Sequence, residues 1–308
     1  MTETITPRDE AHWLEMRDKV ITSTGVSALF GMSPYLTRFE LYHHHANGIK
    51  VPFVSNDRVE KGNRMEQYAA EEVGRQEGWE VEPFKDFAQD AVLRIGSSFD
   101  YTAATPDGKA ILEIKAVDFI RHRDLWVDDQ APEHIEIQLQ WQMMISGIHV
   151  GYIAAFTSVY EFHIYRREYD PEMGAAMLAA VAEFWADVDA GREPDPDFAR
   201  DQDVIAAMFR QLRPDPANFT EDDTLDEVIT RFERYNETKK ESEKLAKAAK
   251  AEIHYMLGEH SEAFGQRYRI KAGWTKDTAD RITAPDEVIK GRKGYRRCDF
   301  KELTPDVN

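Results

Sequence analysis

The spacing of apolar residues predicts helices in the first part of the chain. Helices are expected over about 7–20, 23–30, 39–46 and 57–74. The cluster Ser23-Thr24-Gly25 begins the second helix, and Asn47-Gly48 ends the third with a sequence typical of a helix C-terminus.

Strands follow, from about residue 79 to residue 117. Two apolar runs of strand length, at 92–97 and 110–117, are separated by the turn sequence Thr105-Pro106-Asp107-Gly108. This pattern predicts a β-hairpin. After it the chain is expected to form elements in the order helix, strand, strand, helix, at 132–146, 150–157, 161–168 and 171–190. Alternation of helices and strands indicates an α/β fold.

A change of composition marks the last third of the chain. Residues 191–196 contain two prolines among acidic residues and are typical of a linker, so we expect one domain over 1–196 and a separate region over 197–308. Residues 221–260 are nearly free of Gly and Pro and predict one long helix or a helical hairpin. Short strands are expected within 265–274 and 281–300.

Composition indicates a globular protein. The chain has 308 residues, of which 42% are hydrophobic and 31% charged. It has no run of about 18 apolar residues, and its first residues are polar, so we expect no membrane span, no signal peptide and a cytoplasmic location. The single cysteine, Cys298, can form no internal disulfide and has no CxxC partner for zinc.

The net charge of −18 is unusual for a protein that binds nucleic acid. It does not exclude a nuclease, which needs carboxylates at its centre and a positive surface only where the strand runs. Three other charged features have ordinary interpretations. These are a solvated helix face for His43-His44-His45, a solvated helix in preference to a DNA- or partner-binding arm for 239–250, and either a phosphate-contacting patch or a charged edge strand for 292–297.

The most informative segment is the strand at 110–117. Glu113 and Lys115 are two residues apart, so their side chains emerge from one face of the strand, while Leu112 and Ile114 point the other way. Burying charged groups there is costly unless they are paired or bind something. The pair is therefore either a surface salt bridge on a half-exposed strand or part of a metal and nucleophile site.

Asp100 favours the metal site. It precedes the turn, and pairing of the strands would bring it beside Glu113. Two carboxylates and the carbonyl of Ile114 are hard oxygen ligands that suit Mg²⁺ or Mn²⁺, and Lys115 would orient or stabilise an attacking water at a phosphodiester. Asp107, inside the same interval, is an alternative ligand, although its place before Gly108 suits a turn.

This arrangement resembles the PD-(D/E)xK nuclease superfamily, and flanking motifs narrow the resemblance to the YqaJ and lambda-exonuclease branch of phage recombination nucleases. The similarity covers roughly residues 13–195. Its motifs are Arg17, Thr24, Gly31-Met32-Ser33-Pro34-Tyr35, Gly62-Asn63-Arg64-Met65-Glu66, Ser98-Phe99-Asp100, Glu113-Ile114-Lys115 and the glutamine-rich helix from Gln138 to Gly147. Gly25 follows Thr24 where the family often has an aspartate.

The resemblance implies a restriction-endonuclease-like α/β core, in which a mixed central sheet is flanked by helices, followed by a C-terminal appendage of a long helix and small β-structure. It implies that Glu66, Asp100, Glu113 and the Ile114 carbonyl bind Mg²⁺, for which Mn²⁺ can substitute. Lys115 and Gln138 would complete the catalytic set.

The resemblance also implies the activity and the partners. The expected activity is 5′-to-3′ exonuclease action on double-stranded DNA ends that leaves 3′ overhangs, with Arg17 and Thr24 holding the 5′-terminal phosphate. A single-strand annealing protein and a ring-shaped homo-oligomer, commonly a trimer, are the expected partners. The alternatives are a RecB-like nuclease with another end or strand preference, and an inactive DNA-end-binding module. The chain contains no GxxxxGK[ST] phosphate-binding loop, so no helicase motor is expected within it.

Overall fold

The computed structural model describes residues 2–51, 57–158, 161–210, 214–215, 217–276, 281–284, 287–289 and 296–302, with side chains except at 57–59, 61, 63 and 281–302. The chain divides into two compact units, Met1–Leu212 and Arg213–Asn308. The boundary falls later than the expected residue 196. Arg200 Nη2 donates to the carbonyl of Ser33 at 2.6 Å and Thr37 Oγ1 donates to Asp201 Oδ1 at 2.5 Å, so this stretch packs with the first unit.

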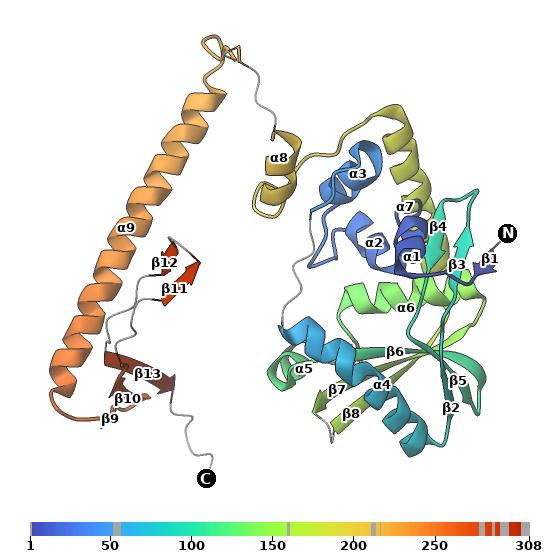
Figure 1. The fold of residues 1–308 in the computed structure, drawn as a ribbon, viewed down its shortest axis with the longest axis horizontal. Coiled ribbons are helices and arrows are strands. Elements are labelled where there is room, and N and C mark those ends of the chain that lie inside the picture. Colours follow the sequence, from blue (N-terminus) through green and yellow to red (C-terminus); the bar gives the residue numbers. More distant parts are fainter. Residues whose placement is uncertain are drawn as a thin grey trace. The chain divides into compact units, whose positions relative to one another are not determined.

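A five-stranded sheet forms the centre of the first unit, with its strands in the order β2, β5, β6, β7, β8 (Figure 1). The strands are β2 Glu80–Pro83, β5 Tyr101–Thr105, β6 Gly108–Ala116, β7 Val150–Ser158 and β8 Glu161–Glu168. Strands β6 and β7 are parallel and the other neighbours are antiparallel. The sheet is therefore mixed, as the resemblance implied, with β6 in the middle.

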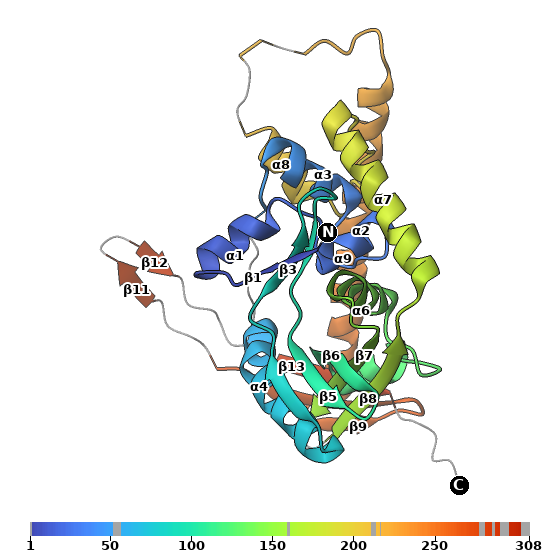
Figure 2. The ribbon, with the colours of Figure 1, turned by 90° about the vertical axis from the view of Figure 1, so that its right-hand side faces the viewer.

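Helices cover both faces of this sheet (Figure 2). Helix α4, Asp57–Glu77, packs on the face that carries Leu112. Helix α6, Glu133–Ser146, packs on the opposite face, where Leu139 shares a core with Ile111. Successive residues of β6 therefore face different helices.

A second layer of the first unit consists of helices and a small sheet. The helices are α1 Glu10–Arg17, α2 Ser23–Leu29, α3 Arg38–Asn47 and α7 Pro171–Ala190, and the strands, in the sheet order β1, β3, β4, are β1 Glu3–Ile5, β3 Phe87–Asp90 and β4 Ile95–Ser97. Helices α2, α3, α6 and α7 share one core, in which Trp141 and Phe184 are fully buried. The short helices α5, Phe119–Leu125, and α8, Gln202–Met208, were not predicted.

Most predicted helices are confirmed, because their ends are set by local sequence. Gly48, Gly147 and Gly191 follow α3, α6 and α7 with φ of 63°, 70° and 66°, a left-handed conformation that glycine adopts without steric cost.

The strand predicted at 92–97 is wrong in its first half. Val92 and Leu93 lie in a turn, where Val92 is 88% exposed, because Asp90 Oδ1 accepts hydrogen bonds from both of their backbone N–H groups. The remaining strand, β4, pairs with β3 and not with β6. The partner of β6 in the predicted hairpin is β5, which begins directly after Asp100.

The solvated face expected for His43-His44-His45 is also wrong. His43 is completely buried and its ring lies edge-on to Phe39, with the centroids 4.3 Å apart. His45 packs against Trp185 at 4.8 Å. His45 therefore belongs to the packing between α3 and α7, while His43 is enclosed beside aromatic residues of α3.

The second unit contains one continuous helix and small sheets. Helix α9 spans Thr224–Leu257, so the long-helix alternative is the one the structure adopts. Strands β9, Glu262–Phe264, β10, Tyr268–Trp274, and β13, Arg296–Glu302, form one sheet, and β11, Arg281–Ala284, pairs with β12, Glu287–Ile289. In the basic stretch 292–297, residues 292–295 lie outside the described residues, while Arg296 and Arg297 begin β13. In the part of the chain that the structure describes, we find no helix that is both long and apolar enough to cross a membrane.

Candidate active site

Glu113 and Lys115 are held together on the α6 side of strand β6. Lys115 Nζ lies 2.6 Å from Glu113 Oε1, and the carboxylate of Glu113 is only 1% exposed while the lysine side chain is 25% exposed. A half-exposed surface salt bridge is thus excluded for Glu113. The pair sits at the inner wall of a pocket, with the ammonium nearer to solvent.

Two glutamines of α6 complete the environment of Glu113. Gln138 Nε2 donates to Glu113 Oε1 at 2.6 Å and Gln142 Nε2 donates to Glu113 Oε2 at 2.8 Å. Gln138 Oε1 also accepts from Lys115 Nζ at 3.1 Å. Because the two glutamines are four residues apart, they share one face of the helix, and both reach the same carboxylate.

The close approach of α6 to the sheet depends on a glycine in β7. A Cβ added to Gly151 would lie 2.8 Å from Leu139 Cδ1 and 3.0 Å from its Cγ. Leu139 is fully buried and follows Gln138 on the helix. A larger residue at position 151 would therefore push the glutamines away from Glu113.

The structure brings Asp100, and not Asp107, beside Glu113. Tyr101 pairs with Leu112, so the residues next to them, Asp100 and Glu113, are opposite one another at the end of the ladder. Asp100 Oδ2 accepts a hydrogen bond from the backbone N–H of Ile114 at 2.9 Å.

Asp107 lies at the other end of the hairpin. At about 3.3 Å per residue, the five steps along β6 from Gly108 to Glu113 span roughly 16 Å, so Asp107 is far from Glu113. Its Oδ2 accepts from Arg166 Nε at 2.8 Å and from the Tyr152 hydroxyl at 3.1 Å. Asp107 thus has a structural role at the turn, and the alternative ligand is removed by geometry.

The carboxylates of this pocket repel one another. Burial and the charge of Glu113 raise the pKa of Asp100 well above its usual value, and the same two causes raise the pKa of Glu66 on helix α4. Burial alone would lower the pKa of Lys115, but Glu113 and Asp100 outweigh it and raise that pKa. Lys115 is therefore a stable ammonium that lies beside these three acids.

This excess of negative charge fits a divalent cation. Asp100, Glu113 and Glu66 supply carboxylate oxygens and Ile114 a backbone carbonyl, which are the ligand types that Mg²⁺ and Mn²⁺ prefer. Among the described residues, no three His, Cys, Asp or Glu side chains converge closely enough to enclose an ion by themselves. A carbonyl ligand in addition to the carboxylates is consistent with that arrangement.

Arg17 and Thr24 lie at the opposite wall of the same pocket. Arg17 Nη2 is 3.4 Å from Thr24 Oγ1, and its guanidinium stacks over the Trp13 ring at 4.4 Å. Burial lowers the pKa of Arg17, and no ion pair holds its guanidinium among the described residues. A partly buried cation that no carboxylate of the described residues holds at ion-pair distance is suited to an anionic ligand.

All predicted site residues line one pocket of about 450 Å³. It contains Arg17, Thr24, Glu66, Asp100, Glu113, Ile114, Lys115 and Gln138, together with Trp13, Ser23, Tyr35, Gly62, Ser98, Ala116 and Phe156. The sequence interpretation did not assign a role to Gln142. Its spacing from Gln138 was the available signal, but only the packing of α6 against β6 shows that both amides reach Glu113.

Comparison with known proteins supports the resemblance. Residues 12–149 match the family model described as YqaJ-like viral recombinase domain, which confirms the resemblance for that region. The protein named "Uncharacterized protein YqaJ" of Bacillus subtilis (strain 168) is 25% identical over 317 residues, which cover 96% of this chain and 95% of the relative.

Two solved structures show partial similarity. An alkaline exonuclease (LHK-Exo) from Laribacter hongkongensis is 18% identical, with a TM-score of 0.49 over 59% of this chain and 93% of that chain. A phage related exonuclease from Haemophilus somnus 129PT is 17% identical, with a TM-score of 0.40 over 60% of this chain and 90% of that chain. Because both TM-scores are below 0.5, the description of the fold rests on the sheet order and helix packing given above.

Proposed function

We propose that this protein is a magnesium-dependent exodeoxyribonuclease that degrades one strand of double-stranded DNA from a 5′ end and leaves a 3′ overhang for phage-type recombination. The observation that carries the proposal is the convergence of Asp100, Glu113, Lys115 and Gln138 in one pocket with an excess of carboxylate charge. The match of residues 12–149 to a viral recombinase domain supports it.

Asp100, Glu113, Glu66 and the Ile114 carbonyl would hold the Mg²⁺, and Mn²⁺ is expected to substitute. When bound, the cation would neutralise charge on the scissile phosphate and lower the pKa of a water molecule. The surrounding carboxylates keep Lys115 protonated, so it acts as a hydrogen-bond donor and a positive charge, and not as a general base. Gln138 holds that ammonium in place by bonding both to it and to Glu113.

The 5′ preference is assigned to Arg17 and Thr24. A guanidinium and a hydroxyl that face the same pocket as the catalytic groups suit the doubly charged terminal phosphate of a 5′ end. A strand anchored there would place the next phosphodiester near Lys115. Direction would follow from that anchor.

Further proposals concern assembly and partners. We expect a homo-oligomeric ring around the DNA, a trimer in the simplest case, and a single-strand annealing protein that receives the 3′ strand in the cytoplasm of a bacterial or phage-infected cell. Light scattering of the purified protein tests the ring, and a strict monomer would contradict it.

The central test uses 5′-phosphorylated linear duplex DNA with Mg²⁺. The Lys115→Ala variant is expected to lose at least about a hundredfold in rate, the scale measured when one preorganised transition-state donor is removed. Lys109→Ala is the matched control, because Lys109 is an exposed lysine on the same strand, outside the catalytic pocket. It should keep the activity of the wild type.

Other outcomes distinguish the alternatives. Activity that survives Lys115→Ala refutes the catalytic assignment. Preference for single strands or for other ends identifies a RecB-like nuclease. DNA-end binding by the wild type without hydrolysis identifies a binding module.

A further inference from the structure

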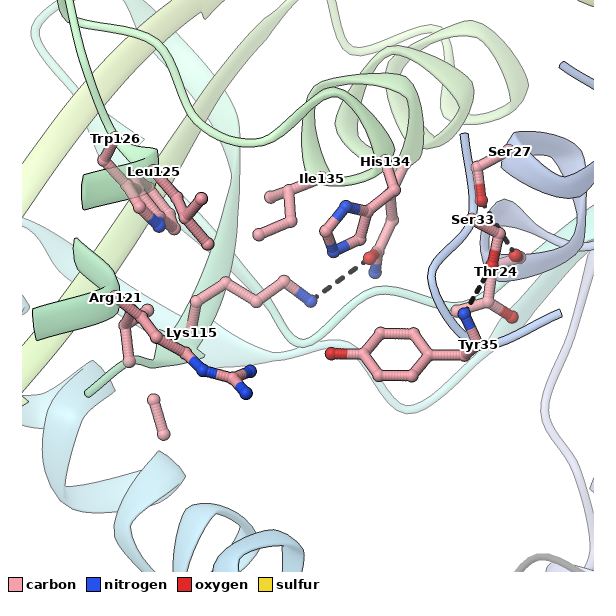
Figure 3. A pocket seen from close by; sticks show the side chains of 13 residues that line it. Thr24, Ser27, Ser33, Tyr35, Lys115, Arg121, Leu125, Trp126, His134 and Ile135 are labelled. Atoms are coloured by element: carbon pink, nitrogen blue, oxygen red, sulfur yellow. Dashed lines mark hydrogen bonds between the residues drawn. The ribbon is translucent and has the colours of Figure 1, made fainter. Parts of the chain in front are cut away.

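A second pocket, drawn in Figure 3, adjoins the catalytic pocket. It has a volume of about 500 Å³, within the range of small-ligand sites. The two pockets share Thr24, Tyr35, Lys115, Ala116 and Gln138. A ligand in the second pocket would therefore lie next to Lys115, beside which the scissile phosphate is proposed to bind.

The walls of the second pocket are largely apolar. Leu125, Trp126, Ile135 and Val117 line it, from α5, α6 and the end of β6. Tyr35 also lines it, with its hydroxyl directed toward the side of Lys115 and Arg121 (Figure 3). Its ring is 80% exposed and meets His134 edge-on, with the centroids 5.9 Å apart. An exposed aromatic ring over an apolar wall is a surface on which a planar group can stack.

The charges in this pocket are all of one sign. Of the described residues that line it, the ionisable side chains besides Tyr35 are Lys115, Arg121 and His134, and none is acidic. This contrasts with the net charge of −18 of the chain and with the carboxylates next door. A pocket without acids, in a protein this acidic, favours an anionic ligand.

Arg121 is the cation of this pocket whose side chain is not bonded to another described residue. No hydrogen bond or ion pair of its guanidinium occurs among the described residues, and its backbone N–H is bonded to the cap of α5, Asp118, at 3.4 Å. Arg123, two residues later on the same helix, is bonded to Asp124 at 2.7 Å and does not line the pocket. Arg121 is thus a pocket cation available for a ligand.

The two arginines flank the catalytic groups. Arg17 lines the catalytic pocket only, Arg121 lines the second pocket only, and Lys115 lies in both. If Arg17 holds the 5′-terminal phosphate and Lys115 faces the scissile phosphate, Arg121 stands where the next phosphate on the 3′ side would be.

We propose that the second pocket binds the second nucleotide of the strand being cut, the one on the 3′ side of the scissile phosphate. Arg121 bonds the phosphate that follows this nucleotide, and its base lies between the Tyr35 ring and the Leu125 and Trp126 wall. Guanidinium groups bind phosphate strongly, and every base has a face that stacks on an aromatic ring. This inference rests on the proposed function and assigns a subsite to it.

The phosphate is tested with a neutral methylphosphonate placed at the linkage 3′ to the scissile one, in single-turnover cleavage of a 5′-phosphorylated duplex. The wild type should slow roughly tenfold, the scale of one charge-assisted hydrogen bond. On the natural linkage, Arg121→Ala should cleave about tenfold more slowly than the wild type. Its rate should not decrease further on the neutral linkage. Arg123→Ala should behave as the wild type. Two results overturn the assignment. The first is a wild-type cleavage rate that is the same on the neutral and the natural linkage. The second is a further decrease in the rate of Arg121→Ala on the neutral linkage, by the same factor as in the wild type.

The base is tested with an abasic second nucleotide. Removal of the base should slow the wild type and Tyr35→Phe roughly tenfold and leave Tyr35→Ala, already slow, unchanged. The high exposure of Tyr35 means that its removal costs the fold little. If Tyr35→Ala is coupled instead to an abasic first nucleotide, the pocket receives the released nucleotide and the assignment is overturned.

Binding separates this inference from the proposed function. Absence of cleavage by the wild type in Mg²⁺ refutes the nuclease proposal. Fluorescence anisotropy with the same duplexes, without divalent metal, then still decides the subsite. The subsite is supported if the neutral linkage weakens DNA binding by the wild type but not by Arg121→Ala. It is refuted if the neutral linkage affects both proteins equally.

Discussion

Replacing Asp100 with asparagine should stabilise the metal-free protein while abolishing hydrolysis. Asp100 is held in a partly buried site beside Glu113, and its pKa is raised, first by burial and then by that neighbour. Asparagine has nearly the same shape and its side-chain oxygen can still accept from the Ile114 N–H, as Asp100 Oδ2 does at 2.9 Å. Asparagine carries no charge, so the substitution removes the repulsion from Glu113 and also removes the carboxylate that would bind the metal.

The sign of the effect follows from the direction in which folding moves the pKa. A carboxyl whose pKa is higher in the folded than in the unfolded state stabilises the fold below its unfolded pKa, which is about 3.9, and this stability is lost as the pH rises through the folded pKa. In general, each tenfold difference in an acid dissociation constant between the folded and unfolded states corresponds to about 1.4 kcal/mol. For a unit the size of Met1–Leu212, a free energy of that size corresponds to about 3–5 °C in Tm.

Thermal unfolding of chelator-treated protein, followed by circular dichroism from pH 4 to pH 8, measures the effect. The Tm of Asp100→Asn should exceed that of the wild type by an amount that grows with pH, and added Mg²⁺ should raise the Tm of the wild type more than that of the variant. Asp107→Asn is the matched control. The hydrogen bonds from Arg166 and Tyr152 lower the pKa of Asp107, so its removal should leave Tm unchanged or reduced at neutral pH.

A Tm for Asp100→Asn at pH 8 that is equal to or below that of the wild type would refute the reasoning. A difference in Tm that does not change with pH would refute it as well, because packing and not charge would then be responsible. Retained nuclease activity in this variant would contradict its role as a ligand.

Single contacts support three further predictions. Gln142→Leu removes the amide that donates to the buried Glu113 Oε2, and differential scanning calorimetry should show a loss of about 1.5–3 kcal/mol, with slower cleavage. His45 has its pKa lowered to about 4, mainly by burial, so its neutral form contributes stability that is lost as the pH falls from about 6.5 toward 4; His45→Phe should unfold less readily over this range, and a wild-type acid profile would contradict the assignment. Arg17→Ala should abolish a preference of about tenfold or more for 5′-phosphate over 5′-hydroxyl ends, measured as a ratio of cleavage rates, whereas Arg8→Ala should not.

The chemistry of the site could be predicted from the sequence because it depends on local periodicity. Alternation along β6 places Glu113 and Lys115 on one face whatever the strand pairs with. The glutamine spacing on α6 is equally local. Asp100 was correctly placed beside Glu113 even though the hairpin was assigned to the wrong strand, since the turn at 105–108 fixed the register on both sides.

What the sequence could not show depends mainly on contacts between distant segments, and in one case on a local side-chain hydrogen bond. The apolar pair Val92-Leu93 is typical of a strand, but the carboxylate of Asp90 captures their N–H groups and forms a turn. His43 looks like a surface residue until α3 packs against α7. Gln142 gains its role only when Gly151 lets α6 approach the sheet. The burial of His43 and the role of Gln142 are tertiary effects, whereas the turn after Asp90 is a local side-chain effect that overrides the strand preference of Val92 and Leu93.

If the proposed function holds, the distribution of charge would let so acidic a chain bind a polyanion. Glu66, Asp100 and Glu113 line one pocket, where burial and then the charge of Glu113 raise the pKa of Asp100 and of Glu66. A divalent cation would reverse the local sign and turn the most repulsive part of the site into the part that attracts phosphate. The adjoining pocket needs no such reversal, because its ionisable lining besides Tyr35 is basic. Binding of the scissile phosphate would therefore depend on the metal, whereas the proposed contacts of Arg17 and Arg121 with the DNA would form without it.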